Sequence, residues 1–423
     1  MRSRSLRVLA TLLLIAPILA ACGTASETSP TTAPATGAEP AGEVQASPVA
    51  GAVACERPLE FWPALSGAEL DFVRQQIPNF EAQTGLTVEI LDVPFDNLQQ
   101  QFIQATPAGE GPDLLYGLND WTGVLAEGGF IADLTDQIDS SQYLENPLQS
   151  VTYQDRIWAV PESYEVVTQY YNPDVLPEGA ESLDGLQTTQ LDTAEYALAF
   201  DITNFYFAAP FLYAVGGQLF DDQGNFVLTE EAATTWLTEL RDLQQQAQFP
   251  AEVTGEAARA LFLGGNAGSY YSGPWDVAEV RNAEFDWQLA PLPSVNGQPA
   301  QPFLGTKALF VSSQSDCQEA ALELARFITG QETQLAWINE VNPAHLPAIQ
   351  SIYDVGEIAD NQIIQGFRQQ AEQSVPLPNI PELGQVWTPA ADALSNVLNA
   401  GVAPEEAAAQ LVETIQSNIE AQQ

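Results

Sequence analysis

Hydrophobic positions between residues 59 and 116 alternate between strand-like and helix-like spacing. Residues 59–62 and 113–116 are short apolar runs, and residues 86–90 alternate as in a half-buried strand. Residues 66–85 and 97–105 carry apolar side chains at helical spacing. The order strand, helix, strand, helix, strand predicts an α/β unit built on a parallel sheet.

Similar patterns return farther along the chain. We expect strands at 157–160, 166–171 and 269–272, and helices at 231–246, 257–263 and 405–423. The globular part, residues 55–423, is longer than one hydrophobic core usually serves, so two lobes are expected.

Two short motifs predict local details. Ser66 and Glu69 have the spacing of a capping box, in which both side chains accept hydrogen bonds from free amides at a helix start. Residues 221–225 resemble a calcium-binding loop only in part, because Gln223 stands at a ligand position and the glycine is displaced. We therefore interpret this segment as a hairpin turn.

The chain begins with the pattern of an export signal. Three arginines precede an apolar run at 12–18 that is too short to span a membrane. The following segment, Leu19-Ala20-Ala21-Cys22, resembles the bacterial lipobox, in which Cys22 becomes the lipidated first residue. We expect a lipoprotein signal peptide at 1–22 and a protein held outside the cytoplasm, anchored to the cell membrane by its N-terminal lipid. Residues 23–54 lack aromatic side chains and are predicted to form a disordered tether.

The charge balance limits the partners. The chain has 12 basic and 56 acidic residues, a formal net charge of −44, and Lys307 is its only lysine. Such a surface repels nucleic acid and anionic lipid headgroups, so neither is an expected partner. Solubility in a salty exterior explains the acidity, and cation capture is the alternative.

Three cysteines are present. If Cys22 carries lipid, Cys55 and Cys317 remain as an even pair in an oxidising compartment, and we predict that they form a disulfide.

Several short motifs, each weak alone, stand together in a characteristic order. They are residues 61–62 with 66–67, 111–113, 119–121, 125–129, 160–161 with Glu165, 170–174, 216–217, 272–275, and 377–381 with Trp387. In this order the chain resembles the bacterial extracellular solute-binding proteins of the maltose/maltodextrin-binding type (family 1), the lipoprotein components of ABC sugar importers. The resemblance covers residues 55–423.

The resemblance implies a two-lobed, periplasmic-binding-protein-like α/β fold with hinge strands and an interlobe ligand cleft. Lobe 1 would comprise 55–164 and 306–330, and lobe 2 would comprise 165–305 and 331–423. In this family the lobes close around a ligand, and the closed state is populated when ligand contacts stabilise it.

The resemblance also implies a set of ligand-contacting residues. Aromatic side chains would stack on the apolar faces of sugar rings, and polar side chains would bind hydroxyl groups. The family's contact positions fall on Trp62, Ser66, Asp120, Trp121, Glu165, Asn204, Tyr206, Phe207, Trp275 and Trp387. The alternative for each aromatic residue is core packing, that for Glu165 is a solvated hinge position, and that for Asp120 is a helix cap.

Departures from the family pattern suggest the chemistry of the ligand. Gly67 and Thr388 stand where maltodextrin binders often place a lysine and a tyrosine, and Trp121 and Ala391 stand at arginine positions. The predicted cleft therefore lacks cations, which argues against phosphate or carboxylate ligands. A neutral saccharide is favoured, and the size and identity of the sugar are left open.

The predicted function is the capture of a neutral carbohydrate, a mono- or oligosaccharide, by lobe closure. The protein would then deliver this sugar to ABC transporter permease subunits. It is expected to be a monomer without cofactor or bound metal. Alternatives are the same fold with a polyol, a cationic solute or a metal ion, and a sensory or adhesive lipoprotein. Tyr170-Tyr171 is similar to the tyrosine pair of iron binders but is interpreted as packing. An enzyme is not expected, because one histidine, His345, excludes most catalytic triads and His-based zinc sites, and because Glu162 and Glu165 lie on one short segment. His345 is interpreted as a structural surface residue of a loop, with ligand contact as the alternative.

Overall fold

The computed structural model describes residues 55–186, 189–221, 223–246, 248–250 and 253–422. The predicted signal peptide 1–22 with Cys22 and the predicted tether 23–54 lie outside the described residues. Within the described part of the chain, no helix combines the length and apolar character needed to cross a membrane.

The first sheet has a parallel centre extended by strands from later in the chain. Its central strand β1 (Leu59–Pro63) pairs in parallel with β2 (Val88–Ile90) and with β3 (Leu114–Leu118). The long strand β11 (Phe303–Val311) pairs antiparallel with β3 on one side and with β6 (Val160–Val166) on the other, and β12 (Val375–Pro376) pairs with its start. The predicted parallel α/β unit is present.

Alternation along the strands places one core on each face of this sheet. Leu114 and Tyr116 enter the core formed with α1 (Gly67–Thr84) and α10 (Gln318–Thr329). Leu115 enters the opposite core, which holds residues of α2 (Phe95–Ala105) and α3 (Thr122–Glu127), and Leu148 of α4 (Glu145–Ser150) packs against it. Burial on both faces is typical of a parallel sheet in an α/β fold.

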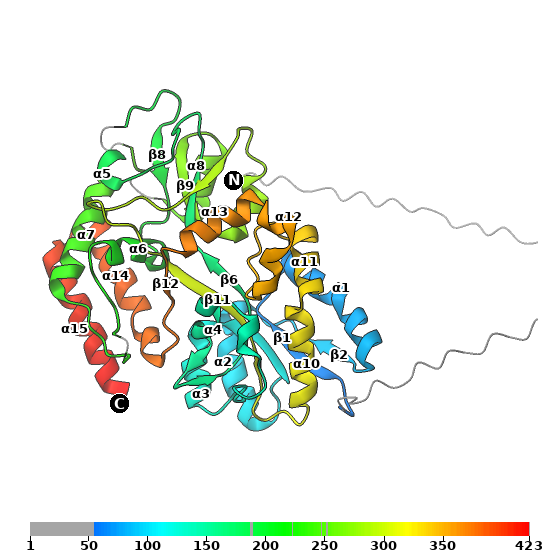
Figure 1. The fold of residues 1–423 in the computed structure, drawn as a ribbon. Helices are drawn as coiled ribbons and strands as arrows, with labels where there is room; N and C mark the ends of the chain where they lie inside the picture. The colour runs from blue at the N-terminus through cyan, green and yellow to red at the C-terminus, as the bar shows by residue number, and fades with distance from the viewer. Residues whose placement is uncertain (1–54, 187–188, 222, 247, 251–252, 423) are drawn as a thin grey trace, which may run out of the picture. The chain divides into compact units, whose positions relative to one another are not determined.

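The second sheet follows the order β10 (Gln288–Ala290), β7 (Thr168–Tyr171), β9 (Ala267–Ser272), β8 (Tyr196–Ala199). One of its faces meets a large core built with α6 (Phe205–Ala214), α7 (Glu230–Gln244), α14 (Trp387–Leu398) and α15 (Pro404–Gln422). Helices α7, α14 and α15 pack side by side (Figure 1). The other face is covered by α8 (Gly255–Leu263) and α13 (Gln362–Ala371).

The remaining helices and strands are short and connect the elements described above along the chain. They are β4 (Thr152–Tyr153), β5 (Arg156–Ile157), α5 (Leu183–Leu186), α9 (Val277–Val280), α11 (Gln331–Glu340) and α12 (Gly356–Ala359), with 3₁₀ helices η1 (Thr106–Ala108), η2 (Asn119–Trp121), η3 (Ser140–Gln142), η4 (Pro274–Asp276), η5 (Gln350–Asp354) and η6 (Pro381–Gln385).

Strands β6 and β11 contribute to the cores around both sheets. β6 begins with Val160 in a core of the first sheet and ends with Val166 in a core of the second. β11 likewise runs from Phe303 in a second-sheet core to Val311 in a first-sheet core. The residue ranges expected for the two lobes stay a prediction.

Three local expectations have clear outcomes. The capping box is wrong, because Ser66 precedes α1 without accepting a capping hydrogen bond and Glu69 instead faces Lys307. The expected strand at 157–160 is also wrong, because β5 ends at residue 157 and β6 starts at residue 160. The turn at residue 221 is confirmed, since Asp221 accepts from the amides of Gln223 and Asn225.

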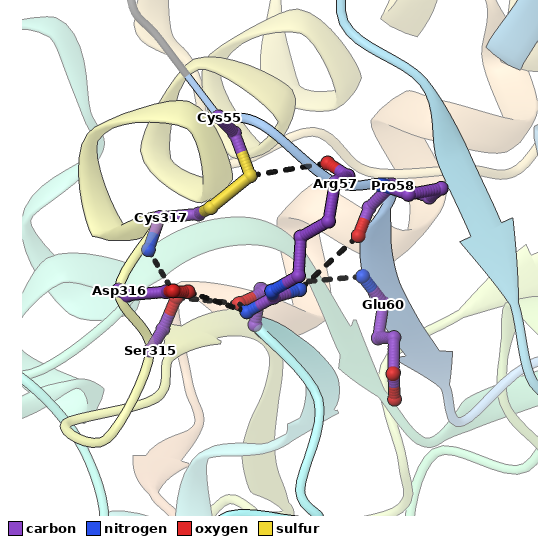
Figure 2. The surroundings of a disulfide bond; sticks show 8 residues. Cys55, Arg57, Pro58, Glu60, Ser315, Asp316 and Cys317 are labelled. Atoms are coloured by element: carbon purple, nitrogen blue, oxygen red, sulfur yellow. Dashed lines mark hydrogen bonds and ion pairs between the residues drawn. A yellow bond between two sulfur atoms is a disulfide. The ribbon is translucent and has the colours of Figure 1, made fainter.

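A disulfide joins the start of the first sheet to the start of α10. Cys55 and Cys317 are bonded across a sequence separation of 262 residues (Figure 2). Beside them, the Arg57 guanidinium binds Asp113 at 2.7 Å and Asp316 at 2.7 Å. Burial alone would raise the pKa of Asp113, but hydrogen bonds from Arg57 and other donors hold this pKa below its usual value.

We expect the disulfide to stabilise the fold by restricting the unfolded chain. The double variant Cys55→Ser/Cys317→Ser should lose about 2–5 kcal/mol of unfolding free energy, measured by urea titration. Reductant should lower the stability of the unaltered protein to the same extent and leave the double variant unchanged. Equal stability of the oxidised and reduced proteins would contradict this expectation.

Candidate ligand-binding site

Five aromatic residues from four parts of the chain form a continuous cluster, here called the aromatic wall: Tyr206, Phe207, Trp275, Phe303 and Trp387. The Tyr206 ring centroid lies 5.7 Å from that of Phe207, 6.4 Å from that of Trp275 and 6.2 Å from that of Phe303. Phe303 in turn lies 6.2 Å from Trp387. The predicted contacts Tyr206, Phe207, Trp275 and Trp387 are therefore brought together, with Phe303 as the buried link.

Local backbone features position the wall. Asn204 caps α6, and its Oδ1 accepts from the Tyr206 amide at 3.0 Å, which sets where the helix and Tyr206 begin. Gly273 precedes η4, and a Cβ atom there would lie 2.1 Å from the Trp275 ring. Glycine is therefore required for this orientation of Trp275, whose side chain is 40% exposed.

Trp62 and Trp121 lie in a core of the first sheet. Both belong to one buried cluster and are only 5% and 7% exposed. Trp121 packs over Gly117, where a Cβ atom would lie 2.5 Å from its ring. Core packing, the alternative left open for the aromatic residues, accounts for most of the surface of these two indoles.

Asp120 sits beside Trp121 in η2, and its neighbour Asn119 anchors this helix. The Asn119 side chain donates to the Leu377 carbonyl at 3.0 Å and accepts from the Thr306 amide at 2.8 Å. Asp120 has a buried Oδ1 atom without a hydrogen-bond partner. Burial raises the pKa of Asp120 from 3.8 to about 6. The Asp120 side chain does not cap η2 or α3, so the alternative interpretation of Asp120 as a helix cap is wrong.

Glu165, Lys307 and Glu69 form an ion-pair group. Lys307 Nζ lies 2.8 Å from Glu165 Oε1 and 3.5 Å from Glu69 Oε2. Burial alone would lower the pKa of Lys307, but the two carboxylates raise it above its usual value. Glu165 pairs with Gly305 on β11, where a Cβ atom would lie 3.9 Å from the Tyr206 hydroxyl, so the ion-pair group lies close to the aromatic wall. Burial, with the negative charges of Glu165 and Asp120, raises the pKa of the Tyr206 hydroxyl.

Ser66 and Asn204 have exposed side chains at the starts of α1 and α6. Asn204 uses its Oδ1 atom to cap its helix, which leaves its amide group for other partners. The ligand-binding role of the ten predicted residues stays a prediction.

Two features of the site were missed by the sequence reasoning. The expected absence of cations is wrong, because Lys307 pairs with the predicted contact Glu165 and with Glu69. The fact that Lys307 is the only lysine of the chain could have marked it as a residue with a specific role. Phe95 is not among the predicted contacts, but its ring lies 6.0 Å from Trp121 and is 51% exposed.

Glu162 and His345 form a buried polar network of their own. Glu162 accepts from the Tyr116 hydroxyl at 2.6 Å and from Gln334 at 2.6 Å, and lies 2.9 Å from His345 Nε2. The His345 ring stacks on Trp337 and is 4% exposed, so its interpretation as a surface residue is wrong. Glu162 is likewise buried, and its carboxylate is engaged by Tyr116, Gln334 and His345.

The tyrosine pair on β7 is also engaged within the protein. The Tyr170 hydroxyl donates to the Gly273 carbonyl at 2.6 Å, and the Tyr171 hydroxyl donates to Gln288 Oε1 at 2.8 Å. These contacts favour the packing interpretation over iron binding.

Comparison with known proteins identifies the family. The profile of the family described as bacterial extracellular solute-binding protein matches residues 75–366, more than half of the chain. The chain belongs to this family. The family and the named relatives are binding proteins rather than enzymes.

This solute-binding protein resembles several sugar-binding proteins. A galactooligosaccharide-binding protein of Bacillus subtilis is 26% identical over 367 residues, covering 82% of this chain and 87% of the relative. A maltose-maltodextrin binding protein of Alicyclobacillus acidocaldarius superposes with a TM-score of 0.74 at 27% identity, covering 85% of this chain and 100% of that one. A cyclo/maltodextrin-binding protein complexed with maltotetraose gives a TM-score of 0.75 at 26% identity, covering 86% and 98%. The predicted two-lobed, periplasmic-binding-protein-like α/β fold is confirmed.

Asp120 should make the unfolding free energy of the solute-binding protein depend on pH. Its pKa is raised in the folded state, so folding is less favourable above pH 6 and gains as the pH falls from about 6 to about 4. Asp120→Asn should therefore stabilise the ligand-free protein by about 1–3 kcal/mol at pH 8 and by little at pH 4.5, measured by urea unfolding.

Asp133 is the matched control for that measurement. Hydrogen bonds from Thr135 lower the pKa of Asp133, so Asp133→Asn should change stability in the opposite direction at pH 8. A loss of stability in Asp120→Asn at pH 8 would show that the carboxylate has a protein partner.

Lys307 should be needed to hold Glu165 and Glu69 in place. Lys307→Met leaves two carboxylates close together without their cation and should cost about 1–3 kcal/mol at pH 7, less than for a fully buried pair because the lysine side chain is 16% exposed. Adding Glu165→Gln should recover part of this loss. The control Arg74→Met removes exposed ion pairs and should cost under about 1 kcal/mol. No recovery in the double variant would contradict the pairing.

Proposed function

We propose that this solute-binding protein captures a neutral carbohydrate between the aromatic wall and the carboxylates of Asp120 and Glu165. The observation that carries the proposal is the position of Glu165 beside Tyr206. Glu165 pairs with Gly305, where a Cβ atom would lie 3.9 Å from the Tyr206 hydroxyl. The Tyr206 ring in turn lies 6.4 Å from that of the exposed Trp275. Aromatic faces suit the C–H surface of a sugar ring, and carboxylate oxygens accept hydrogen bonds from its hydroxyl groups. The sugar-binding relatives support the same ligand class.

The Oδ1 atom of Asp120, which has no hydrogen-bond partner in the protein, is available to accept a hydrogen bond from the ligand. A buried carboxylate oxygen without a donor costs free energy in the empty protein, and a sugar hydroxyl that donates to it recovers that cost on binding. This oxygen favours ligands rich in hydroxyl groups over apolar ones, and it disfavours anions.

Transport follows as the larger role. We propose that binding closes the two lobes, that the closed form delivers the sugar to ABC permease subunits, and that Cys22 carries a lipid that holds a monomeric protein at the membrane. The resemblance to a maltooligosaccharide ABC transporter lipoprotein of Streptococcus pneumoniae, 22% identical over 332 residues, supports this role. No catalytic step is proposed.

A cationic solute is the second candidate. Glu69, Asp120 and Glu165 outnumber the single Lys307 in the group, which leaves the site with negative charge. Binding of a cation would weaken with rising salt, whereas binding of a neutral sugar would change little.

The test is ligand-induced stabilisation across a library of mono- and oligosaccharides. A sugar at 100 times its dissociation constant should add about 2.7 kcal/mol to the unfolding free energy. Trp275→Ala should abolish this gain while leaving the ligand-free melting temperature within a few degrees, because Trp275 is 40% exposed. The control Val227→Ala removes another exposed apolar side chain and should leave sugar binding intact.

Stabilisation by polyamines but by no sugar would favour the cationic candidate. A large fall in the melting temperature of ligand-free Trp275→Ala would show instead that this indole is part of the core.

A further inference from the structure

Exposed aromatic side chains are rare in this protein. Of the eight tryptophan, twelve tyrosine and nineteen phenylalanine residues, all of which lie in the described part of the chain, only Phe95 and Trp275 are exposed. Each of the two packs against a residue of the predicted ligand-contact set, Phe95 against Trp121 and Trp275 against Tyr206. Trp275 is part of the proposed site, whereas Phe95 has no assigned role.

Phe95 is held firmly although its ring is exposed. It is the first residue of α2, and Val93, Leu98 and Phe102 on either side of it are buried in the same core as Trp62 and Trp121. The Asn97 amide donates to the Pro94 carbonyl at 2.9 Å, which fixes the turn into the helix. The backbone at Phe95 is therefore fixed, and the exposed ring offers an apolar surface beside Trp121.

Folding does not explain the exposed ring. Phe95 continues the helical spacing of Leu98 and Phe102, which are both fully buried, yet half of its own surface stays in water. Its ring centroid lies 6.0 Å from that of Trp121 with the planes inclined by 31°, so the two rings form a short aromatic surface. Asp120, with its buried and unpartnered Oδ1 atom, is adjacent in sequence to Trp121.

We propose that Phe95 is a ligand-binding residue that extends the site on the first-sheet side, and that the physiological ligand is an oligosaccharide with one sugar unit stacked on this ring. The proposal rests on the proposed function. The aromatic wall and Asp120 bind one part of the chain, and Phe95 binds a sugar unit farther along it. A monosaccharide does not reach Phe95, so this residue sets the preference for longer ligands.

The test measures how affinity depends on ligand length. Dissociation constants of glucose, maltose, maltotriose and maltotetraose, and of galactose with the corresponding galactooligosaccharides, are determined by calorimetry for the unaltered protein, Phe95→Ala and Phe95→Trp. In the series that binds, Phe95→Ala should weaken the longer ligands about 3- to 10-fold and leave the shortest bound ligand unchanged. Phe95→Trp should keep the preference for longer ligands, because an indole also stacks.

Leu91→Ala is the matched control. Leu91 is 50% exposed and lies four residues before Phe95, but it is aliphatic. Its replacement should change no affinity. Phe95→Leu separates stacking from simple apolar contact, and it should behave like Phe95→Ala.

The outcomes distinguish this proposal from the one on which it rests. Sugar binding with the same length dependence in Phe95→Ala as in the unaltered protein contradicts the role of Phe95 and leaves the proposed function intact. Unchanged sugar affinity together with lost transport would assign Phe95 to the permease interface and also overturn the proposal. Failure of every sugar to bind the unaltered protein contradicts the proposed function and this role with it.

Discussion

The antiparallel pairing of β6 with β11 is the constraint on which the rest of the structure depends. These two strands are shared by the cores of both sheets, and they bring together segments that are more than a hundred residues apart in sequence. In their register Glu165 lies opposite Gly305 and Lys307 lies opposite Ser163, so Glu165 and Lys307 are diagonal neighbours. A register shift directly after Lys307 marks a local irregularity of the kind that redirects side chains near functional sites.

This pairing explains why the candidate site combines charge with aromatic surface. Gly305, which lies opposite Glu165, would place a Cβ atom 3.9 Å from the Tyr206 hydroxyl, an ordinary contact distance. The ion-paired Glu165 and Lys307 therefore lie close to the aromatic wall. The group offers more acceptors than donors, with one acceptor of Asp120 left unused by the protein. A ligand with many hydroxyl donors and apolar ring faces complements such a surface.

The elements that follow from local patterns could be predicted from the sequence, and those that depend on distant partners could not. The parallel β1, β2 and β3 unit with its helices follows from the spacing of apolar residues. β6 was misplaced because its residues Glu162 and Glu165 look like surface positions. Their partners come from other segments: Tyr116, Gln334 and His345 for Glu162, and Lys307 for Glu165. His345 was misassigned for the same reason. The set of candidate contacts came from family resemblance, whereas the exposure of Phe95 and the pairing of Lys307 required the structure.

A crystal structure of the protein with an oligosaccharide that raises its melting temperature is the most direct test of this account. We predict that the sugar lies with a ring face on Trp275 or Tyr206 and a hydroxyl group within hydrogen-bonding distance of Asp120 Oδ1. Sugar bound elsewhere on the protein, with Asp120 still lacking a partner, would contradict the account.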